Sequence, residues 1–331
     1  MSPRTTRNGK GREEFVSYYG RPVIKAPSWS AQDIAGYFFL GGLAGAGSVL
    51  AAGAQLTGRD TTATALKMSS LAAVGLSAAA LVHDLGRPSR FAHMLRVFKP
   101  TSPMSMGSWL LSAYGPAAGT AAFTAVTGRM PRTGAAATTA AGLLGTGLAT
   151  YTAVLAADTA VPAWHGAHRE LPYLFAASAT AAAAGMALVA APLRENAPAR
   201  CASALAAVAD FAASRAVERR LGSVAVTYRE GKAGTLMRAA RGLTAAGAAA
   251  ALLLGHRSRP AAAGAGLALL AGSACTRFGV FAAGIASAED PVHTIAPQRE
   301  AARQRAEHTP DAERAAHTQD AGHAERSERS R

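Results

Sequence analysis

The chain has 331 residues and a formal net charge of +14; 50% of its residues are hydrophobic and only 16% are charged. This pattern excludes an ordinary soluble enzyme, because the charges crowd into residues 1–30 and 288–331 and leave long apolar stretches between them. The composition predicts an all-α integral membrane protein. It would have a polar basic N-terminal segment (1–30), a membrane domain (31–288) and a disordered charged tail (289–331).

Eight apolar stretches in chain order are long enough to cross a membrane as helices. They cover residues 33–56, 63–83, 107–127, 135–157, 171–191, 200–217, 236–254 and 261–286. The stretch 200–217 also fits an amphipathic or partly buried helix, because it carries Asp210 and Arg215. In the first stretch Gly41 and Gly45 are four residues apart, a spacing that lets helices approach closely in lipid.

An even number of spans places both termini on one side of the membrane. The segments expected on that side hold fifteen Lys and Arg residues, and the opposite loops hold seven. The positive-inside rule therefore predicts a multi-pass protein of the cell membrane with cytoplasmic termini. The basic residues flank apolar helices without interleaved aromatic residues, so we expect them to meet membrane lipid and not nucleic acid.

Alternating helix directions bring several polar residues to the membrane interface on the side of the termini, and no comparable group is expected at the other interface. The gathered residues are Asp33, Tyr37, His83, Asp84, Tyr151 and Asp158. Ionisable groups beside hydrocarbon are costly, so this group is a candidate functional site. In the structural alternative, Asp84 caps its own segment or pairs with Arg87 or Arg90.

Two further features have mainly structural interpretations. Trp109 and Trp164 suit headgroup-level aromatic positions. Arg277 lies midway along the last stretch and needs an anion, for which Asp210 is the candidate at a similar depth. Cys201 and Cys275 are too few and too far apart for an iron–sulfur cluster, a zinc site or a disulfide framework.

Several motifs resemble the NrfD/PsrC-type family, the membrane subunits of polysulfide-reductase-like complexes. The resemblance extends over about residues 29–298. The motifs that carry it are His83-Asp84-Leu85-Gly86-Arg87-Pro88, Ser102-Pro103-Met104-Ser105, Gly107-Ser108-Trp109, Tyr151-Thr152-Ala153-Val154-Leu155, Val161-Pro162-Ala163-Trp164 and Arg277-Phe278-Gly279.

The resemblance implies an eight-helix subunit that has no haem, iron–sulfur cluster or metal of its own. Such a subunit passes electrons between menaquinone or ubiquinone, bound as substrate, and a ferredoxin-like [4Fe–4S] subunit. That partner serves a molybdopterin catalytic subunit, in a complex of the formate dehydrogenase or polysulfide/nitrite reductase type.

The resemblance also implies roles for individual residues. It makes Tyr151 the tyrosine at the quinone head group, places Asp33 and Tyr37 near the first-helix positions, and matches His83 and Asp84 to the motif. With Asp158 these residues would bind quinone or relay protons. Because both lie on the side where the polar residues gather, we expect the segment 84–100 and the loop 164–170 to dock the iron–sulfur partner, through Arg87, Arg90, Lys99, Trp164 and His168.

Two other functions remain open from the residues alone. A haem b membrane subunit needs two histidines deep in facing helices, whereas His83, His93, His165, His168 and His256 fall at helix ends or in loops. A secondary transporter typically shows internal repeats and a polar cluster at the midplane, for which only Asp210 and Arg277 are candidates.

Overall fold

The computed structural model describes residues 24, 27, 29–84, 93–290 and 292. The chain divides into two compact units, Ala26–Ser287 and a second unit made of Met1–Lys25 with Ala288–Arg331. Most of the expected N-terminal segment (1–30) and nearly all of the expected disordered tail (289–331) lie outside the described residues.

The first unit is helical throughout its regular structure, with no strand among the described residues. Eight long helices are described: α1 (Ala31–Leu56), α2 (Asp60–Asp84), α4 (Pro103–Thr127), α5 (Pro131–Ala157), α7 (Leu171–Ala190), α8 (Ala197–Leu221), α9 (Gly231–Leu253) and α10 (Arg259–Glu289). Short helices also lie in the connections that the structure describes: α6 (Pro162–His165), η1 (Leu193–Glu195) and η2 (Gly222–Tyr228).

Each of the eight apolar stretches coincides with one of these long helices, so the prediction of an all-α membrane protein is confirmed. Five helices, α1, α2, α5, α7 and α10, are long and apolar enough to cross a membrane. The largest differences are at α8, which is 25 residues long, and at α9, which already begins at Gly231. Both helices extend into polar sequence that hydropathy alone does not assign to a span.

Local chemistry sets several helix boundaries. The side chain of Ser30 accepts a hydrogen bond from the backbone N–H of Asp33 at 3.4 Å and so caps α1. Ser102 caps α4 in the same way through the N–H of Ser105. At the other end of α4, Gly128 has a φ of 67°, the left-handed conformation that commonly ends helices.

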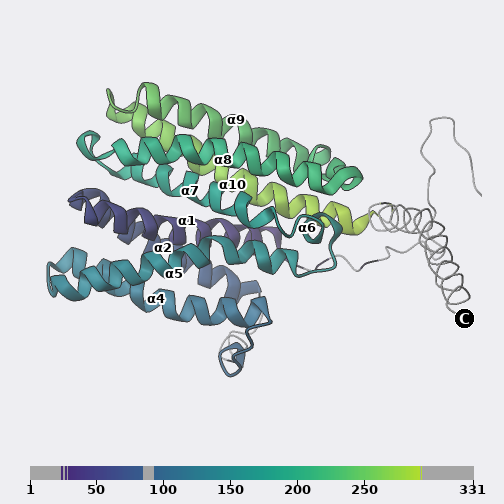
Figure 1. Ribbon diagram of the computed structural model, residues 1–331, viewed down its shortest axis with the longest axis horizontal. Coiled ribbons are helices and arrows are strands. Elements are labelled where there is room, and N and C mark those ends of the chain that lie inside the picture. Colours follow the sequence, from purple (N-terminus) through teal and green to yellow (C-terminus); the bar gives the residue numbers. More distant parts are fainter. Residues whose placement is uncertain (1–23, 25–26, 28, 85–92, 291, 293–331) are drawn as a thin grey trace, which may run out of the picture. The chain divides into compact units, whose positions relative to one another are not determined.

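The helices lie side by side along a common direction, as Figure 1 shows. Helix α1 packs against α2, α5 and α7; α4 packs against α5 and α2; and α8 lies between α7 and α9. Of the five candidate spans, α1 and α7 are the most buried. These two helices therefore form the centre of the bundle, and α1 contacts most of the elements that carry the predicted site.

Glycine contacts bring helix backbones together inside the bundle. A Cβ atom at Gly145 of α5 would lie 2.5 Å from the carbonyl oxygen of Gly45 in α1. Likewise a Cβ atom at Gly185 of α7 would lie 2.6 Å from the carbonyl oxygen of Gly266 in α10. Gly45 therefore makes the close approach that its spacing predicts. At Gly41 an added Cβ would meet only Ser77, at an ordinary contact distance of 3.4 Å.

Large apolar side chains project from the outside of the bundle. Many are more than half exposed, which suits contact with lipid tails. They are Leu56, Leu76, Phe123, Val126, Leu143, Leu205, Val208, Phe211, Leu253 and Leu267. The buried interior, by contrast, consists largely of alanine. The chain is therefore a multi-pass membrane protein whose centre is packed by small residues.

We predict that Gly45→Ala lowers the thermal midpoint of the purified protein in detergent. The new methyl group would meet the backbone of Gly145, which cannot move as a side-chain tip can, and such overpacking costs about 1–3 kcal/mol. Gly53→Ala in the same helix is the matched control, because nothing lies within 4 Å of an added Cβ there. Equal midpoints for the two variants would contradict the proposed role of the α1–α5 contact.

Candidate functional site

Two polar contacts join the start of α1 to the end of α2. The Nδ1 atom of His83 lies 3.0 Å from Oδ2 of Asp33. The backbone N–H of Ser30 donates to Oδ1 of Asp84 at 3.2 Å, which places a carboxylate beside the positive end of the α1 dipole. Asp84 thus caps the neighbouring helix. Arg87 and Arg90, its other expected partners, lie outside the described residues.

The Asp33–His83 pair lies at the water-facing edge of the group. The His83 side chain is 80% exposed, whereas that of Asp33 is 21% exposed. An imidazole in contact with both water and a carboxylate is chemically suited to exchange protons. The sequence predicts that polar residues of α1 and α2 come together on this side. Asp33, His83 and Asp84 do so, because they lie at adjoining helix ends.

Two tyrosines meet edge to face below this pair. The ring centroids of Tyr37 (α1) and Tyr151 (α5) are 6.3 Å apart, with an interplanar angle of 78°. Tyr37 is fully buried, and its hydroxyl has no hydrogen-bond partner among the described residues. No hydrogen bond from the Tyr151 hydroxyl occurs there either. Since buried hydroxyls are nearly always paired, the unpartnered Tyr37 hydroxyl makes this pair of rings a candidate site for an acceptor from outside the chain.

Tyr151 is held in place by a third helix. An added Cβ at Gly107 of α4 would overlap the Tyr151 ring, so α4 can lie directly against the ring only because residue 107 is glycine. Helices α1, α4 and α5 therefore jointly fix the two phenols. The motif Gly107-Ser108-Trp109, noted in the sequence, acquires a physical role from this contact.

Arg277 of α10 is fully buried near the same end of α1. Its Nη2 atom donates to the carbonyl oxygen of Phe175 at 2.6 Å, and its guanidinium carbon lies 3.8 Å from the centroid of the Phe175 ring. The expected direct pair with Asp210 is wrong: among the described residues no ion pair within 4.0 Å involves Arg277. A carbonyl and an aromatic face contact the cation instead, and Asp210 attracts it over a longer distance. The Nε and Nη1 atoms of Arg277 are buried without a hydrogen-bond partner among the described residues.

Trp164 differs from its expected docking role. It is fully buried, its Nε1 donates to the carbonyl oxygen of Val280 at 2.8 Å, and it stacks on Trp29 with ring centroids 5.8 Å apart. A buried indole cannot contact a partner at the surface, nor lie in a headgroup belt. Trp164 instead holds the loop after α5 against α10. Its partner is distant in the sequence, so the position of Trp164 in the chain does not reveal this role.

The remaining predicted residues lie at the surface on the same side. Asp158 is exposed at the C-terminal cap of α5, and among the described residues no hydrogen bond connects its side chain to the tyrosines. His168 is exposed and stacks on His165 at 5.7 Å between ring centroids. Lys99 is also exposed. The side chains of His168 and Lys99 are therefore both accessible.

A second polar cluster, which the sequence did not predict, occupies the other end of α1 and α2. The nearly buried ammonium of Lys67 donates to Oε1 of Gln55, which also accepts from the Thr138 hydroxyl at 3.2 Å. Nearby, the hydroxyls of Ser48 and Tyr114 lie 2.7 Å apart. The expectation of a single polar interface is therefore wrong. The feature of the sequence that could have revealed this cluster is Lys67, a charged residue inside the apolar stretch 63–83.

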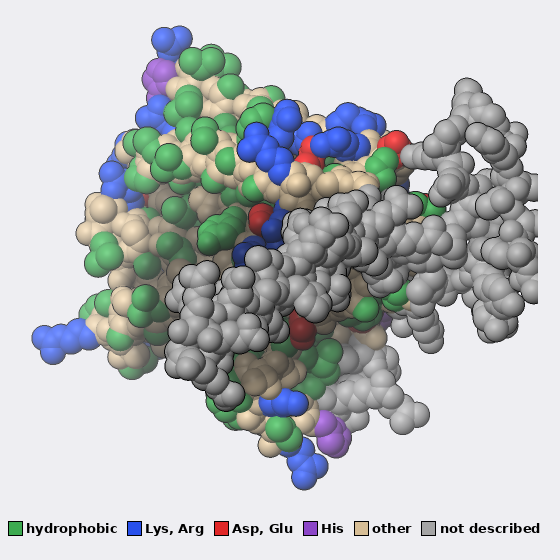
Figure 2. All heavy atoms as spheres, turned by 45° about the vertical axis from the view of Figure 1, so that its right-hand side comes forward, with side chains coloured by type: hydrophobic (Ala, Val, Ile, Leu, Met, Phe, Trp, Pro, Cys, Tyr) green, Lys and Arg blue, Asp and Glu red, His purple; other side chains and the backbone are tan. Residues whose placement is uncertain are grey.

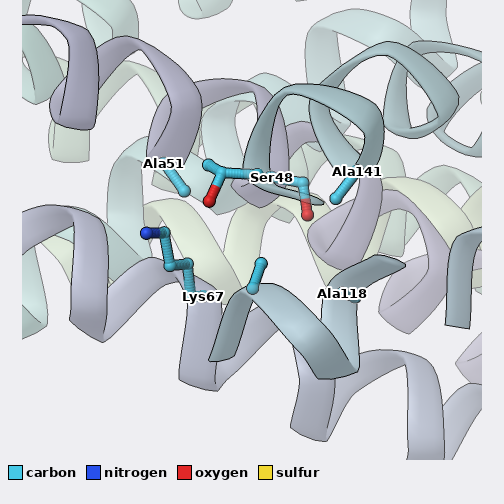
Figure 3. Close-up of a pocket in the computed structure, with 7 residues that line it drawn as sticks. Ser48, Ala51, Lys67, Ala118 and Ala141 are labelled. Carbon is cyan, nitrogen blue, oxygen red and sulfur yellow. The ribbon is translucent and has the colours of Figure 1, made fainter. Parts of the chain in front are cut away.

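Small cavities accompany this second cluster. One of about 10 Å³, roughly the room for one water, is lined by Ser48, Lys67 and Thr138. Figure 3 shows Lys67 extending from α2 towards the side of the pocket formed by Ser48 and Ala51 of α1. A second cavity, of about 320 Å³, is lined by residues that include Gln55, Asp60 and Lys67. Lys67 thus borders both cavities, and its ammonium group is hydrogen-bonded to the side chain of Gln55.

We predict that Gln55→Leu destabilises the protein, because it leaves the Lys67 ammonium without its close acceptor. Loss of a buried partner of a charged group costs about 1–3 kcal/mol or more. The measurement is the thermal midpoint in detergent, with Gln32→Leu as control, since Gln32 is exposed at the start of the same helix. If Lys67→Met in the Gln55→Leu background does not restore stability, Lys67 is not the reason for the loss.

Metal ligands are not grouped in the part of the chain that the structure describes. Within it, no set of three or more His, Cys, Asp or Glu side chains could hold a metal ion. Cys201 is free and exposed, and Cys275 is free and partly buried. The described site is thus built from phenols, a carboxylate–imidazole pair and a buried arginine.

Comparison with known proteins identifies a family. Residues 25–204 match the family described as polysulphide reductase, NrfD. No curated protein matches the chain. The matched region covers more than half of the sequence and runs from before α1 into α8. It contains the two tyrosines, the Asp33–His83 pair, the Lys67 cluster and the loop anchored by Trp164, whereas Arg277 lies beyond it.

Proposed function

We propose that this chain, which belongs to the polysulphide reductase NrfD family, exchanges electrons between a partner iron–sulfur subunit and a quinone in the membrane. Family membership supports a membrane subunit of a polysulfide or nitrite reductase-like complex. The observation that carries the quinone assignment is the buried, unpartnered hydroxyl of Tyr37, whose ring contacts that of Tyr151 next to the Asp33–His83 pair.

The chemistry of the proposed site follows from these groups. Reduction of a quinone to a quinol takes up two electrons and two protons, and oxidation of the quinol releases them. A phenol hydroxyl can donate to a quinone carbonyl oxygen, and the exposed His83 beside Asp33 can exchange protons with water. The electrons come from, or go to, the [4Fe–4S] clusters of the partner, which in turn serve a molybdopterin catalytic subunit. The substrate is menaquinone or ubiquinone.

The proposed topology has all eight long helices crossing the cell membrane with both termini in the cytoplasm. The three helices beyond the five most apolar ones are α4, α8 and α9. Support for α8 comes from its outward face, where Leu205, Val208 and Phe211 are exposed. The excess of Lys and Arg on the side of the termini, fifteen against seven, supports the orientation.

We place the docking surface for the iron–sulfur partner on the side of the two phenols. The end of α6 and the loop after it expose His165, His168 and Arg169, and Lys99 precedes α4 on the same side. Electrons must enter within a short distance of the quinone, so the docking surface and the site belong at one end of the bundle. Trp164, beneath this loop, holds its base against α10.

We predict that Tyr151→Phe and Tyr37→Phe each slow quinone-coupled electron transfer by the assembled complex by about 10- to 100-fold. A lost hydrogen bond in a buried site costs about 1–3 kcal/mol. Stability should be unchanged, because neither hydroxyl has a partner among the described residues whose loss would destabilise the fold. Quinone reduction or quinol oxidation is measured at equal membrane content, with Tyr173→Phe, an exposed tyrosine, as control.

Rates for both variants equal to that of Tyr173→Phe would show that the phenols serve packing only and would remove the main support for the quinone site. A drop in protein level with unchanged turnover per complex would lead to the same conclusion. Loss of turnover with normal assembly is the outcome that the proposal requires.

We also predict where the partner attaches. A photo-crosslinking residue in place of the exposed His168 should form an adduct with the iron–sulfur subunit in membranes. The same residue in place of Met130, which is exposed at the opposite end between α4 and α5, should not. Adducts at position 130 alone would place the docking surface at the other end of the bundle.

A further inference from the structure

We infer that α8, η2 and α9 form a binding site for one anionic phospholipid, with its phosphate in an arginine-lined pocket. The inference rests on the proposal that α8 crosses the membrane. It does not depend on the quinone site, because the residues involved lie beyond the matched region 25–204.

The pocket has a volume of about 390 Å³ and a strongly basic lining. Cavities of about 300–1,000 Å³ accommodate small organic ligands. The lining residues are Arg215, Glu218, Tyr228, Arg229, Gly234, Arg238 and Arg241. Four arginines face one carboxylate, which leaves three positive charges in excess. Figure 2 shows Lys and Arg side chains gathered in the upper part of the molecule, where α8 and α9 run, with acidic side chains beside them.

The arginines are held in position before any ligand binds. Glu218, which is almost buried, accepts from Nε and Nη2 of Arg229 at 3.1 and 2.8 Å and also from Nη2 of Arg241. Arg238 donates to the carbonyl oxygen of Arg229 at 3.0 Å. Gly234 allows this carbonyl to lie against α9, since an added Cβ would overlap it. A preorganised set of guanidinium groups loses little entropy when it binds phosphate.

Positive charge remains unneutralised in this arrangement. Among the described residues, Nε of Arg241 is shielded from water and has no hydrogen-bond partner. The Tyr228 phenol adds no negative charge, because burial raises its pKa and its hydroxyl donates to the carbonyl oxygen of Ala163. A phosphate oxygen is the acceptor that guanidinium groups bind best, so the expected ligand is a phosphate-bearing anion.

An apolar stripe on α8 indicates that this phosphate belongs to a lipid. Leu205, Val208 and Phe211 are 72%, 71% and 53% exposed, and their three-residue spacing places them on one face of the helix. The stripe leads to Arg215, whose guanidinium carbon lies 5.1 Å from the centroid of the Phe211 ring. Acyl chains can follow the stripe while the headgroup enters the pocket. The pocket lies on the side expected to face the cytoplasm, where anionic lipids meet basic groups.

The test uses the full-length protein, purified and delipidated in detergent, and follows the thermal midpoint during titration. The probes are phosphatidylglycerol, phosphatidylcholine and inorganic phosphate. Phosphatidylglycerol should raise the midpoint, and the other two should not at equal concentration. Arg215→Gln should weaken the apparent affinity about fivefold, the equivalent of about 1 kcal/mol per basic residue. Arg220→Gln, an exposed arginine on the same helix outside the pocket, is the control.

Arg215 is a suitable target because its described contact is with the Phe211 ring and not with Glu218, so its loss leaves the buried carboxylate paired. Val208→Asn tests the acyl-chain stripe separately and should also weaken phosphatidylglycerol binding. If inorganic phosphate reproduces the stabilisation, the site binds free phosphate and the lipid proposal is overturned. A phosphatidylglycerol effect that is the same in Arg215→Gln and Arg220→Gln, or no effect at all, would equally overturn it. The quinone kinetics of the assembled complex test the proposed function separately.

Discussion

Backbone contact between helices at glycine is the constraint on which the rest of the structure depends. Lipid tails are as apolar as the helices, so burial of apolar surface gives little attraction between spans, and close packing has to provide it. The Gly45–Gly145 contact places α1 against α5, and the Gly185–Gly266 contact places α7 against α10. Since Tyr37 lies on α1 and Tyr151 on α5, the relative position of the two phenols follows from how closely these backbones approach.

The two ends of α1 carry polar groups of different character. At the end where α1 begins, the buried hydroxyl of Tyr37 has no hydrogen-bond partner among the described residues. At the other end, Lys67 and Tyr114 are paired with protein groups. A buried hydrogen-bond donor without a protein partner can bind a ligand, whereas a donor that is already paired stabilises the fold. Helix α1 thus carries the proposed quinone site at one end and a charge paired with protein groups at the other.

The helices and the side on which the polar residues gather could be predicted because both depend on local sequence. A run of about twenty apolar residues forms a span, and alternating directions then decide which ends are neighbours. The surroundings of Trp164, Arg277 and Lys67 could not be predicted in this way. Trp164 bonds to a residue 116 positions away, and Arg277 to one 102 positions away. In an alanine-rich bundle many helix rotations have similar apolar patterns, so such pairings are decided by packing alone.

The stacked indoles give the protein an internal optical reporter. Of its three tryptophans, Trp29 and Trp164 form one stack, next to the Phe281 ring, whereas Trp109 is partly exposed beside Phe98. The stack joins the residues just before α1 to the loop after α5 and to α10. Any movement of that loop must separate or tilt these rings. With Trp109 replaced by phenylalanine, tryptophan emission would come from this stack alone and would register such movement without an attached dye.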